Sequence, residues 1–276
     1  MIVTIDTGGT KTLISSFNSQ GKMGESIKFP TPKDTKEYVK ILTQTIQENF
    51  LHENVEVIVL ALPGIVKDGI AVWCNNLGWQ NFAAHQQLKD ALPGVPFLVE
   101  NDANLAGLAE TRALNPVPIS SLYITISTGI GSGICTNGHI DPGTRYSEAG
   151  RALIEYDGKV REWEKFASGH AIVDIYKQFA RDITSKRTWR QIADRISRGF
   201  LAVIPILQPD VIIIGGSVGT YFDRYHEYLE GILKEHLPPH IPCPKIVQAQ
   251  HPEEAVIYGC YYHGKDFLAD KKISGR

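Results

Sequence analysis

The chain has 276 residues, 43% hydrophobic and 21% charged, with a formal net charge of -2 at pH 7. This length predicts two lobes, each large enough to bury its own core. The near-neutral charge gives no strong attraction to nucleic acid or to an anionic membrane, which argues against proteins whose main function is to bind either. The four cysteines, Cys74, Cys135, Cys243 and Cys260, are too widely spaced for a disulfide framework or a zinc knuckle, so a reducing cytoplasm is the expected location.

The first predicted strand begins at Ile2. No basic and apolar leader precedes it, and no apolar stretch approaches the ~20 residues that a membrane-spanning helix needs. We therefore expect neither export nor membrane insertion, and no DNA-binding module ahead of the first strand.

A glycine turn joins the first two predicted strands, 2–6 and 11–17. Gly8 and Gly9 lie in this turn. Because glycine lacks Cβ and tolerates positive φ, the turn can bring successive backbone N–H groups close to an anion. Asp6 ends the first strand, where a nucleotide-bound Mg²⁺ would need a carboxylate oxygen. The turn is therefore a candidate phosphate site.

The next segments alternate between helix and strand. Apolar residues recur at helical spacing over 39–50, and the apolar runs 55–62 and 97–99 predict buried strands. A helix is expected over 105–114, followed by a proline-containing linker at 115–118. This alternation favours an α/β fold.

The linker divides the predicted fold into two parts. We expect a small N-terminal α/β lobe over 1–114 and a larger C-terminal α/β lobe over 115–276. A further helix is predicted at about 255–270.

The second half begins with a strand that also ends in a glycine turn. The strand is predicted over 122–127, and Gly129 and Gly131 follow it. A long amphipathic helix is predicted over 192–207. The short buried strand 211–214 then leads into Gly215 and Gly216, and open α/β sheets place ligand loops at such strand ends.

The two glycine turns resemble each other in sequence. Thr4 to Gly8 is Thr-Ile-Asp-Thr-Gly, and Thr125 to Gly129 is Thr-Ile-Ser-Thr-Gly. Since Ser127 replaces Asp6 in the second copy, one metal ligand set is expected rather than two. The repeat suggests two walls of one nucleotide cleft. The alternative is that both segments are ordinary glycine-turn β-hairpins.

The chain resembles the ROK family of bacterial sugar kinases over nearly its whole length. The ordered motifs that carry the resemblance are Asp6-x-Gly8-Gly9-Thr10-Lys11, Glu100-Asn101-Asp102-Ala103-Asn104, Ser127-Thr128-Gly129-x-Gly131, Glu148-x-Gly150, Glu164 with Ala167-Ser168-Gly169, and Ile214-Gly215-Gly216. This family is related to glucokinase, actin, Hsp70 and hexokinase. The resemblance implies two ribonuclease-H-like lobes of the actin/hexokinase ATPase type with a central cleft, and a C-terminal helix that returns to the small lobe.

The resemblance also implies roles for individual residues. Asp102 would accept the proton of the sugar hydroxyl as the phosphorus–oxygen bond forms. The implied sugar-binding residues are Asn76, Asn101, Glu148, Arg151 and Glu164. The implied ATP and phosphate residues are Asp6, Gly8, Gly9, Thr10, Lys11, Thr128, Gly129, Gly131, Gly215 and Gly216, with Asp6 holding Mg²⁺ through the nucleotide.

Each of these roles has a structural alternative. Asp102 could cap the helix that follows it, and the two glutamates could be solvated surface groups. The segment around Asn76 could be a plain turn followed by a core tryptophan, Trp79. Lys11 could be one of the many lysines that flank glycine turns.

One motif departs from the family pattern. The family has Glu-x-Gly-His followed by a cysteine cluster that binds structural zinc, whereas this chain has Glu148-Ala149-Gly150-Arg151 and neither cysteine nor histidine between Arg151 and Glu164. Tetrahedral zinc needs about four nitrogen or sulfur ligands, so we predict a protein without a zinc site. Arg151 replaces the family's histidine, which would contact the sugar. It either supports Glu148 and nearby backbone or recognises a different, anionic substituent.

The predicted function is ATP-dependent phosphorylation of a hexose or N-acetylhexosamine hydroxyl, with ATP and Mg²⁺ as cofactors. The alternatives are a non-catalytic sugar-binding regulator on the same scaffold and a degenerate kinase that binds sugar poorly. The expected partners are the sugar and ATP, with neither nucleic acid nor membrane, and the sequence leaves a homodimer open.

Overall fold

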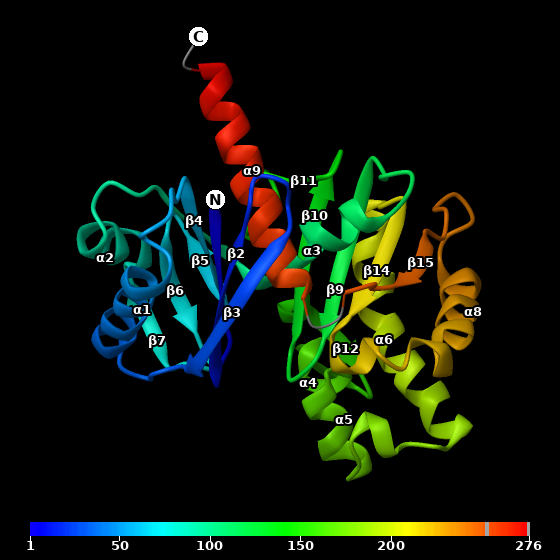
Figure 1. Ribbon diagram of the computed structural model, residues 1–276. Coiled ribbons are helices and arrows are strands. Elements are labelled where there is room, and N and C mark those ends of the chain that lie inside the picture. The colour runs from blue at the N-terminus through cyan, green and yellow to red at the C-terminus, as the bar shows by residue number, and fades with distance from the viewer. Residues whose placement is uncertain (252–253, 275–276) are drawn as a thin grey trace. The chain divides into compact units, whose positions relative to one another are not determined.

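The computed structural model describes residues 1–251 and 254–274. Contacts within the chain divide it into unit 1, Met1–Ala109 with Glu254–Arg276, and unit 2, Glu110–Glu253. Each unit is built on its own five-stranded sheet (Figure 1). The lobe boundaries at 114 and 115 stay a prediction.

Unit 1 contains a mixed sheet in the order β3-β2-β1-β4-β8. Its strands are β1 (Ile2–Thr7), β2 (Lys11–Phe17), β3 (Met23–Pro30), β4 (Val57–Leu62) and β8 (Phe97–Asn101). β1 is antiparallel to β2 and parallel to β4, and β4 is parallel to β8. All six residues of β4 are buried, as expected for a central strand covered on both faces.

Helices cover the sheet of unit 1. They are α1 (Thr35–Asn49), α2 (Ala84–Ala91) and α9 (Ala255–Ser274), whereas α3 (Asp102–Ala113) follows β8 directly and belongs to unit 2 from Glu110. Ile58 and Leu60 belong to the core cluster that contains the α1 residue Leu42, whereas Val57 and Val59 lie beside Gly264 of α9. Because side chains alternate between the faces of a strand, α1 and α9 cover opposite faces of β4. A smaller sheet is formed by β5 (Ile65–Lys67), β6 (Ile70–Cys74) and β7 (Trp79–Phe82).

Unit 2 contains a second mixed sheet in the order β11-β10-β9-β14-β15. Its strands are β9 (Ser120–Ile126), β10 (Ile130–Thr136), β11 (His139–Ile140), β14 (Val211–Gly215) and β15 (Lys245–Gln248). β9 and β10 form an antiparallel hairpin, and β9 and β14 are parallel. The sheet repeats the pattern of unit 1, in which a glycine-turn hairpin is followed by a parallel neighbour.

The rest of unit 2 is mostly helical. Its elements are η1 (Ala149–Arg151), β12 (Leu153–Tyr156), β13 (Lys159–Glu162), α4 (Glu164–Ala167), α5 (Gly169–Tyr176), η2 (Ala180–Asp182), α6 (Lys186–Leu207), α7 (Gly216–Gly219), η3 (Phe222–Arg224) and α8 (His226–His236). α6 begins at a cap in which Ser185 Oγ accepts the Thr188 N–H (3.3 Å), and it packs against α8. Its buried face includes Ile196 and Phe200, on the stripe predicted from the sequence. Within residues 1–251 and 254–274, no helix has the length and apolarity to cross a membrane.

Candidate functional site

The first glycine turn connects β1 to β2 as a hairpin. The Gly8 N–H donates to the Lys11 carbonyl (2.9 Å), and the side chains of Thr10 and Lys11 are exposed. Neither Gly8 nor Gly9 has a positive φ. Space at Gly9 is tight instead, because an added Cβ would lie 3.2 Å from the Cβ of Asn76. The backbone is therefore a hairpin, and its role in phosphate binding stays a prediction.

Asp6 lies near the end of β1, beside Ala61 of β4. Burial raises the pKa of its carboxyl to about 6, because taking the charge out of water disfavours the ionised form. Mg²⁺ in nucleotide sites is held by one or two carboxylates together with the phosphates. A single half-buried carboxylate at this position fits that donor set.

Asn101 and Asp102 lie at the junction of β8 and α3. The Asn101 Oδ1 accepts the Asn104 N–H (3.0 Å), and its Nδ2 donates to the Gly64 carbonyl (2.7 Å). The buried Glu100 accepts the Asn101 N–H (2.9 Å) and the Asn104 amide (3.0 Å). Asp102 accepts the N–H of the adjacent Ala103 (2.8 Å). Asn101 is therefore the N-cap residue of α3. The hydrogen bonds of Glu100, Asn101 and Asn104 hold the backbone on both sides of Asp102.

Asn76 lies exposed in the turn between β6 and β7. The Lys33 ammonium group donates to the Asn76 carbonyl (2.7 Å) and to the Gly9 carbonyl (3.0 Å), so it joins this turn to the first glycine turn. The buried Trp79 indole donates to the Lys33 carbonyl (2.8 Å). The turn and the buried Trp79 are both observed, and a role of Asn76 in sugar binding stays a prediction. Lys33 is a residue that the motifs did not reveal.

The second glycine turn, between β9 and β10 of unit 2, lies against Glu164. An added Cβ at Gly129 would lie 2.7 Å from the Glu164 Oε2, and this oxygen also accepts the Ile130 N–H (3.4 Å). A side chain at 129 would therefore displace the carboxylate from its present position. Thr128 is exposed at the tip of the turn, and Gly131 lies at the start of β10.

Glu148 precedes η1 and is tied to the same end of β10. The Ser132 hydroxyl donates to the Ser147 carbonyl (3.1 Å) and accepts the Ala149 N–H (3.0 Å), which fixes the backbone on both sides of Glu148. Burial raises the pKa of Glu148, the Arg151 charge lowers it, and the Glu164 charge raises it. The two glutamates therefore lie close enough to repel each other.

Arg151 forms ion pairs with two acids. Its Nη1 lies 2.8 Å from the Glu162 Oε2 and 3.2 Å from the Glu164 Oε1. These ion pairs are the kind of contact that a supporting role would need, and the role of Arg151 itself stays a prediction. Within residues 1–251 and 254–274, no group of histidine, cysteine, aspartate and glutamate side chains could hold a metal ion by itself.

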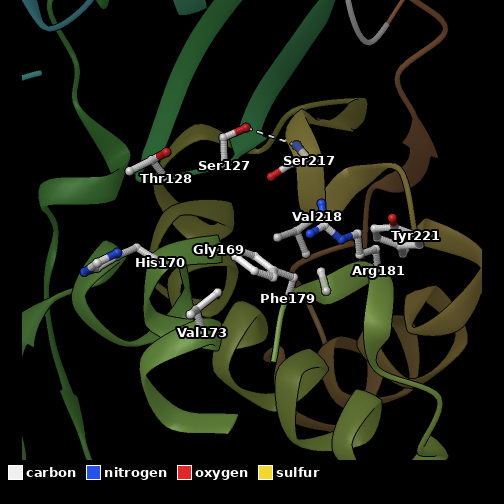
Figure 2. Close-up of a pocket in the computed structure, with 11 residues that line it drawn as sticks. Ser127, Thr128, Gly169, His170, Val173, Phe179, Arg181, Ser217, Val218 and Tyr221 are labelled. Atoms are coloured by element: carbon white, nitrogen blue, oxygen red, sulfur yellow. Dashed lines mark hydrogen bonds between the residues drawn. The ribbon is translucent and has the colours of Figure 1, made fainter. Parts of the chain in front are cut away.

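The loop after β14 contacts the second glycine turn directly. Gly216 has a φ of +82°, and an added Cβ would lie 2.6 Å from the Ile126 carbonyl and 2.7 Å from the Ser127 Oγ. The Ser217 N–H donates to the Ser127 Oγ (3.0 Å), as Figure 2 shows. Gly216 is required both for its left-handed backbone and for this close approach.

A pocket of about 340 Å³ opens beside this contact, within the size range of small-ligand sites. It is lined by Ser127, Thr128, Gly169, His170, Val173, Phe179, Ala180, Arg181, Ser217, Val218 and Tyr221 (Figure 2). The Arg181 guanidinium lies 4.6 Å from the centroid of the Phe179 ring. The sequence motifs included Thr128 and Gly169 but gave no signal for Phe179, Arg181 or Tyr221.

The candidate residues thus form two groups. Unit 1 holds Asp6, the first glycine turn, Asn76, Asn101 and Asp102. Unit 2 brings together the second glycine turn, Glu148, Arg151, Glu164 and the loop at Gly215 and Gly216. Within unit 2, the second glycine turn lies against Glu164, and Ser127 and Thr128 beside it line the pocket.

Comparison with known proteins gives consistent matches over nearly the whole chain. The N-acetylmannosamine kinase of Haemophilus influenzae is 26% identical over 302 residues, covering 98% of this chain and 97% of its own length. The structure of a ROK hexokinase from Thermus thermophilus matches with a TM-score of 0.77 and 25% identity, covering 96% of this chain and 99% of that one. The structure of an inorganic polyphosphate/ATP-glucomannokinase from an Arthrobacter species matches with a TM-score of 0.70 and 27% identity, covering 96% and 98%. The family model for ROK matches residues 2–266, and the chain therefore belongs to the ROK family, with the actin-type ATPase fold of its sugar kinases.

Proposed function

We propose that this ROK protein transfers the terminal phosphoryl group of ATP to a hydroxyl group of a hexose or an N-acetylhexosamine. The protein is a carbohydrate kinase, the class for which the similar proteins are named. One observation carries the proposal. The carboxylate of Glu164 fills the space beside Gly129 and accepts the Ile130 N–H, so a phosphate-type turn and a sugar-type acid are adjacent.

The nucleotide would occupy the pocket beside Ser127 and Ser217. The Phe179 and Tyr221 rings that line it offer π faces for a purine base. The backbone at Thr128, Gly129 and Gly131 would bind phosphate oxygens, as would residues 8–11 in unit 1. Gly215 and Gly216 would shape the floor, because Gly216 leaves no room for a side chain there.

Mg²⁺ would be held by Asp6 through the nucleotide phosphates. When bound, it neutralises charge on the transferring group. The side chain of Asp6 is half-buried, and this burial raises the pKa of its carboxyl to about 6. A divalent cation there would favour the ionised carboxylate.

The sugar would be bound by acceptors that distinguish one hydroxyl pattern from another. These are Glu148 and Glu164 in unit 2, with Asn76 and Asn101 in unit 1. Asp102 would accept the hydroxyl proton late in the reaction, because an alcohol is far too weak an acid to lose it beforehand. The remaining steps need alignment rather than covalent chemistry.

A coupled ADP-release assay tests this proposal. It would compare glucose, fructose, mannose, N-acetylmannosamine, N-acetylglucosamine and a few β-glucosides, with and without Mg²⁺. We expect Mg²⁺-dependent ADP release with one or a few of these sugars above the rate without sugar. Sugar binding by calorimetry without any ADP release would instead identify a non-catalytic sensor.

All four cysteines are free thiols, which supports the cytoplasm as the proposed location.

A further inference from the structure

The segment from Arg151 to Glu164 is where the family resemblance leads one to expect structural zinc. This segment has no cysteine or histidine, so its donor atoms do not fit tetrahedral zinc. It forms instead the β12–β13 hairpin, whose turn contains Asp157 (φ 52°) and Gly158 (φ 69°). Two successive positive φ angles are typical of a tight hairpin turn.

Arg151 connects the two ends of this hairpin, as a metal ion bound by residues from both ends would. Arg151 precedes the hairpin, Glu162 is its last residue and Glu164 begins α4. One guanidinium nitrogen, Nη1, reaches both acids, at 2.8 Å and 3.2 Å. The Trp163 N–H donates to the Ala152 carbonyl (2.9 Å) and closes the same loop through the backbone.

Packing holds the rest of the hairpin on unit 2. The Tyr156 ring stacks on the Phe166 ring with centroids 4.8 Å apart, and the Tyr156 hydroxyl donates to the Asp194 carboxylate of α6 (2.9 Å). The Trp163 side chain is fully buried against Phe200. The backbone of Glu164 therefore follows the buried Trp163, and its carboxylate is held by the Arg151 guanidinium.

The charges around Glu164 bear on the kind of sugar. Glu162 and Glu164 share the Arg151 guanidinium, and the charges of Glu148 and Glu164 raise each other's energy. The cations that face them are Arg151 and Lys165, whose ammonium group lies 3.5 Å from the Glu164 Oε1 but is largely exposed. Water screens such an exposed pair strongly. The Arg151 guanidinium is already shared by two carboxylates, so it is not available to an anionic group on the sugar. The net negative charge of the surrounding acids would also repel such a group.

We propose that the Arg151–Glu162–Glu164 cluster replaces structural zinc in this chain, with Arg151 as a positioning residue that aims Glu164 at a neutral sugar. The proposal rests on the proposed function, because it concerns the same sugar site. It excludes sugar phosphates and sugar acids as substrates. A guanidinium can bond two carboxylates at once, whereas a lysine ammonium acts as a single point charge.

The test compares Arg151→Gln, Arg151→Lys and Glu162→Gln with Lys159→Gln, a control that removes one cation from the exposed part of the same hairpin. With a neutral sugar identified by the ADP-release screen, Arg151→Gln should raise the sugar KM at least about tenfold while leaving the ATP KM within about twofold. Arg151→Lys should restore part of the loss, and Lys159→Gln should match the wild type. An unchanged sugar KM in Arg151→Gln overturns the proposal. So does wild-type activity on glucuronate or glucosamine 6-phosphate that this variant loses.

Two measurements keep this test separate from that of the proposed function. Metal analysis should find no zinc in the purified protein, and about one zinc per chain would overturn the proposal. The unfolding free energies of Arg151→Gln, Glu162→Gln and the double variant should show coupling between the two residues. If the wild type phosphorylates no sugar, the proposed function fails while this coupling still tests the cluster. The absence of coupling rejects the cluster even in an active enzyme.

Discussion

Replacement of Gly199 by alanine should displace the indole that precedes Glu164. Gly199 lies on the buried face of α6, and an added Cβ would lie 2.5 Å from the Trp163 Cε3, with two further ring atoms closer still. Ordinary carbon contacts need at least ~3.5 Å, so the closest atoms of the ring must move by about 1.5 Å. Overpacking of this severity costs about 3 kcal/mol of unfolding free energy, against a gain of ~1 kcal/mol in helix propensity.

Gly231→Ala provides a matched control in the same unit. Gly231 lies in α8 with open space around an added Cβ, so this variant gains the helix propensity without the clash. The difference between the two variants in urea unfolding, followed by tryptophan fluorescence, should therefore equal the packing cost of about 3 kcal/mol. Gly199→Ala should also raise the sugar KM, because Glu164 follows Trp163. Equal stability of the two variants would refute the reasoning.

Three further substitutions test the site residues separately. Asp102→Asn should lower kcat at least ~100-fold while sugar affinity by calorimetry stays nearly unchanged, and an unchanged kcat would remove Asp102 from its proposed role. Glu148→Gln should weaken sugar binding but stabilise the fold at neutral pH, because burial raises the pKa of Glu148 and the ionised form therefore costs stability. This advantage should shrink as the pH falls through the raised pKa, since the protonated carboxyl resembles the amide, and a less stable variant at neutral pH would contradict it. Phe179→Ala should raise the ATP KM about tenfold without affecting the sugar KM if the ring stacks on the base, and an equal effect on both would indicate loss of folding instead.

Much of the fold follows from local patterns in the sequence. The run 55–62 contains β4 (Val57–Leu62), and the helical stripe over 192–207 is the C-terminal part of α6 (Lys186–Leu207). Both signals arise from burial of an apolar face, which repeats along the chain with the period of the element. The helix predicted at about 255–270 corresponds to α9 (Ala255–Ser274).

The parts that sequence reasoning missed depend on contacts between distant residues. Phe179 and Arg181 lie between α5 and α6, and only folding places them beside Ser127 and Ser217. Glycine in the two turns was interpreted through its missing Cβ and its tolerance of positive φ. Gly8, Gly9, Gly129 and Gly131 have no positive φ, and the reason found at Gly129 is space, because an added Cβ would meet the Glu164 carboxylate. That reason is visible only once the two segments meet.

The β12–β13 hairpin is different, because the sequence did carry its signal. Asp157-Gly158 lies between the two short strands β12 and β13, and an Asp-Gly pair between two strands predicts a tight hairpin. Recognising it would have brought Arg151 and Glu162 together. The ion pairs would then have followed from the register of the two strands.

Helix α9 packs on β1 and β4, and Gly264 allows it to approach so closely that an added Cβ would lie 3.0 Å from Ile2. Since the chain passes through the whole of unit 2 between β8 and α9, a ribosome finishes that middle section before it reaches the helix. One face of the sheet of unit 1 therefore stays uncovered until α9 has been synthesised, whereas unit 2 can already fold. During this interval the nascent chain exposes the apolar faces of β1 and β4, which favour aggregation with other chains. We therefore expect this kinase to depend on chaperones during synthesis more than a protein with contiguous domains does.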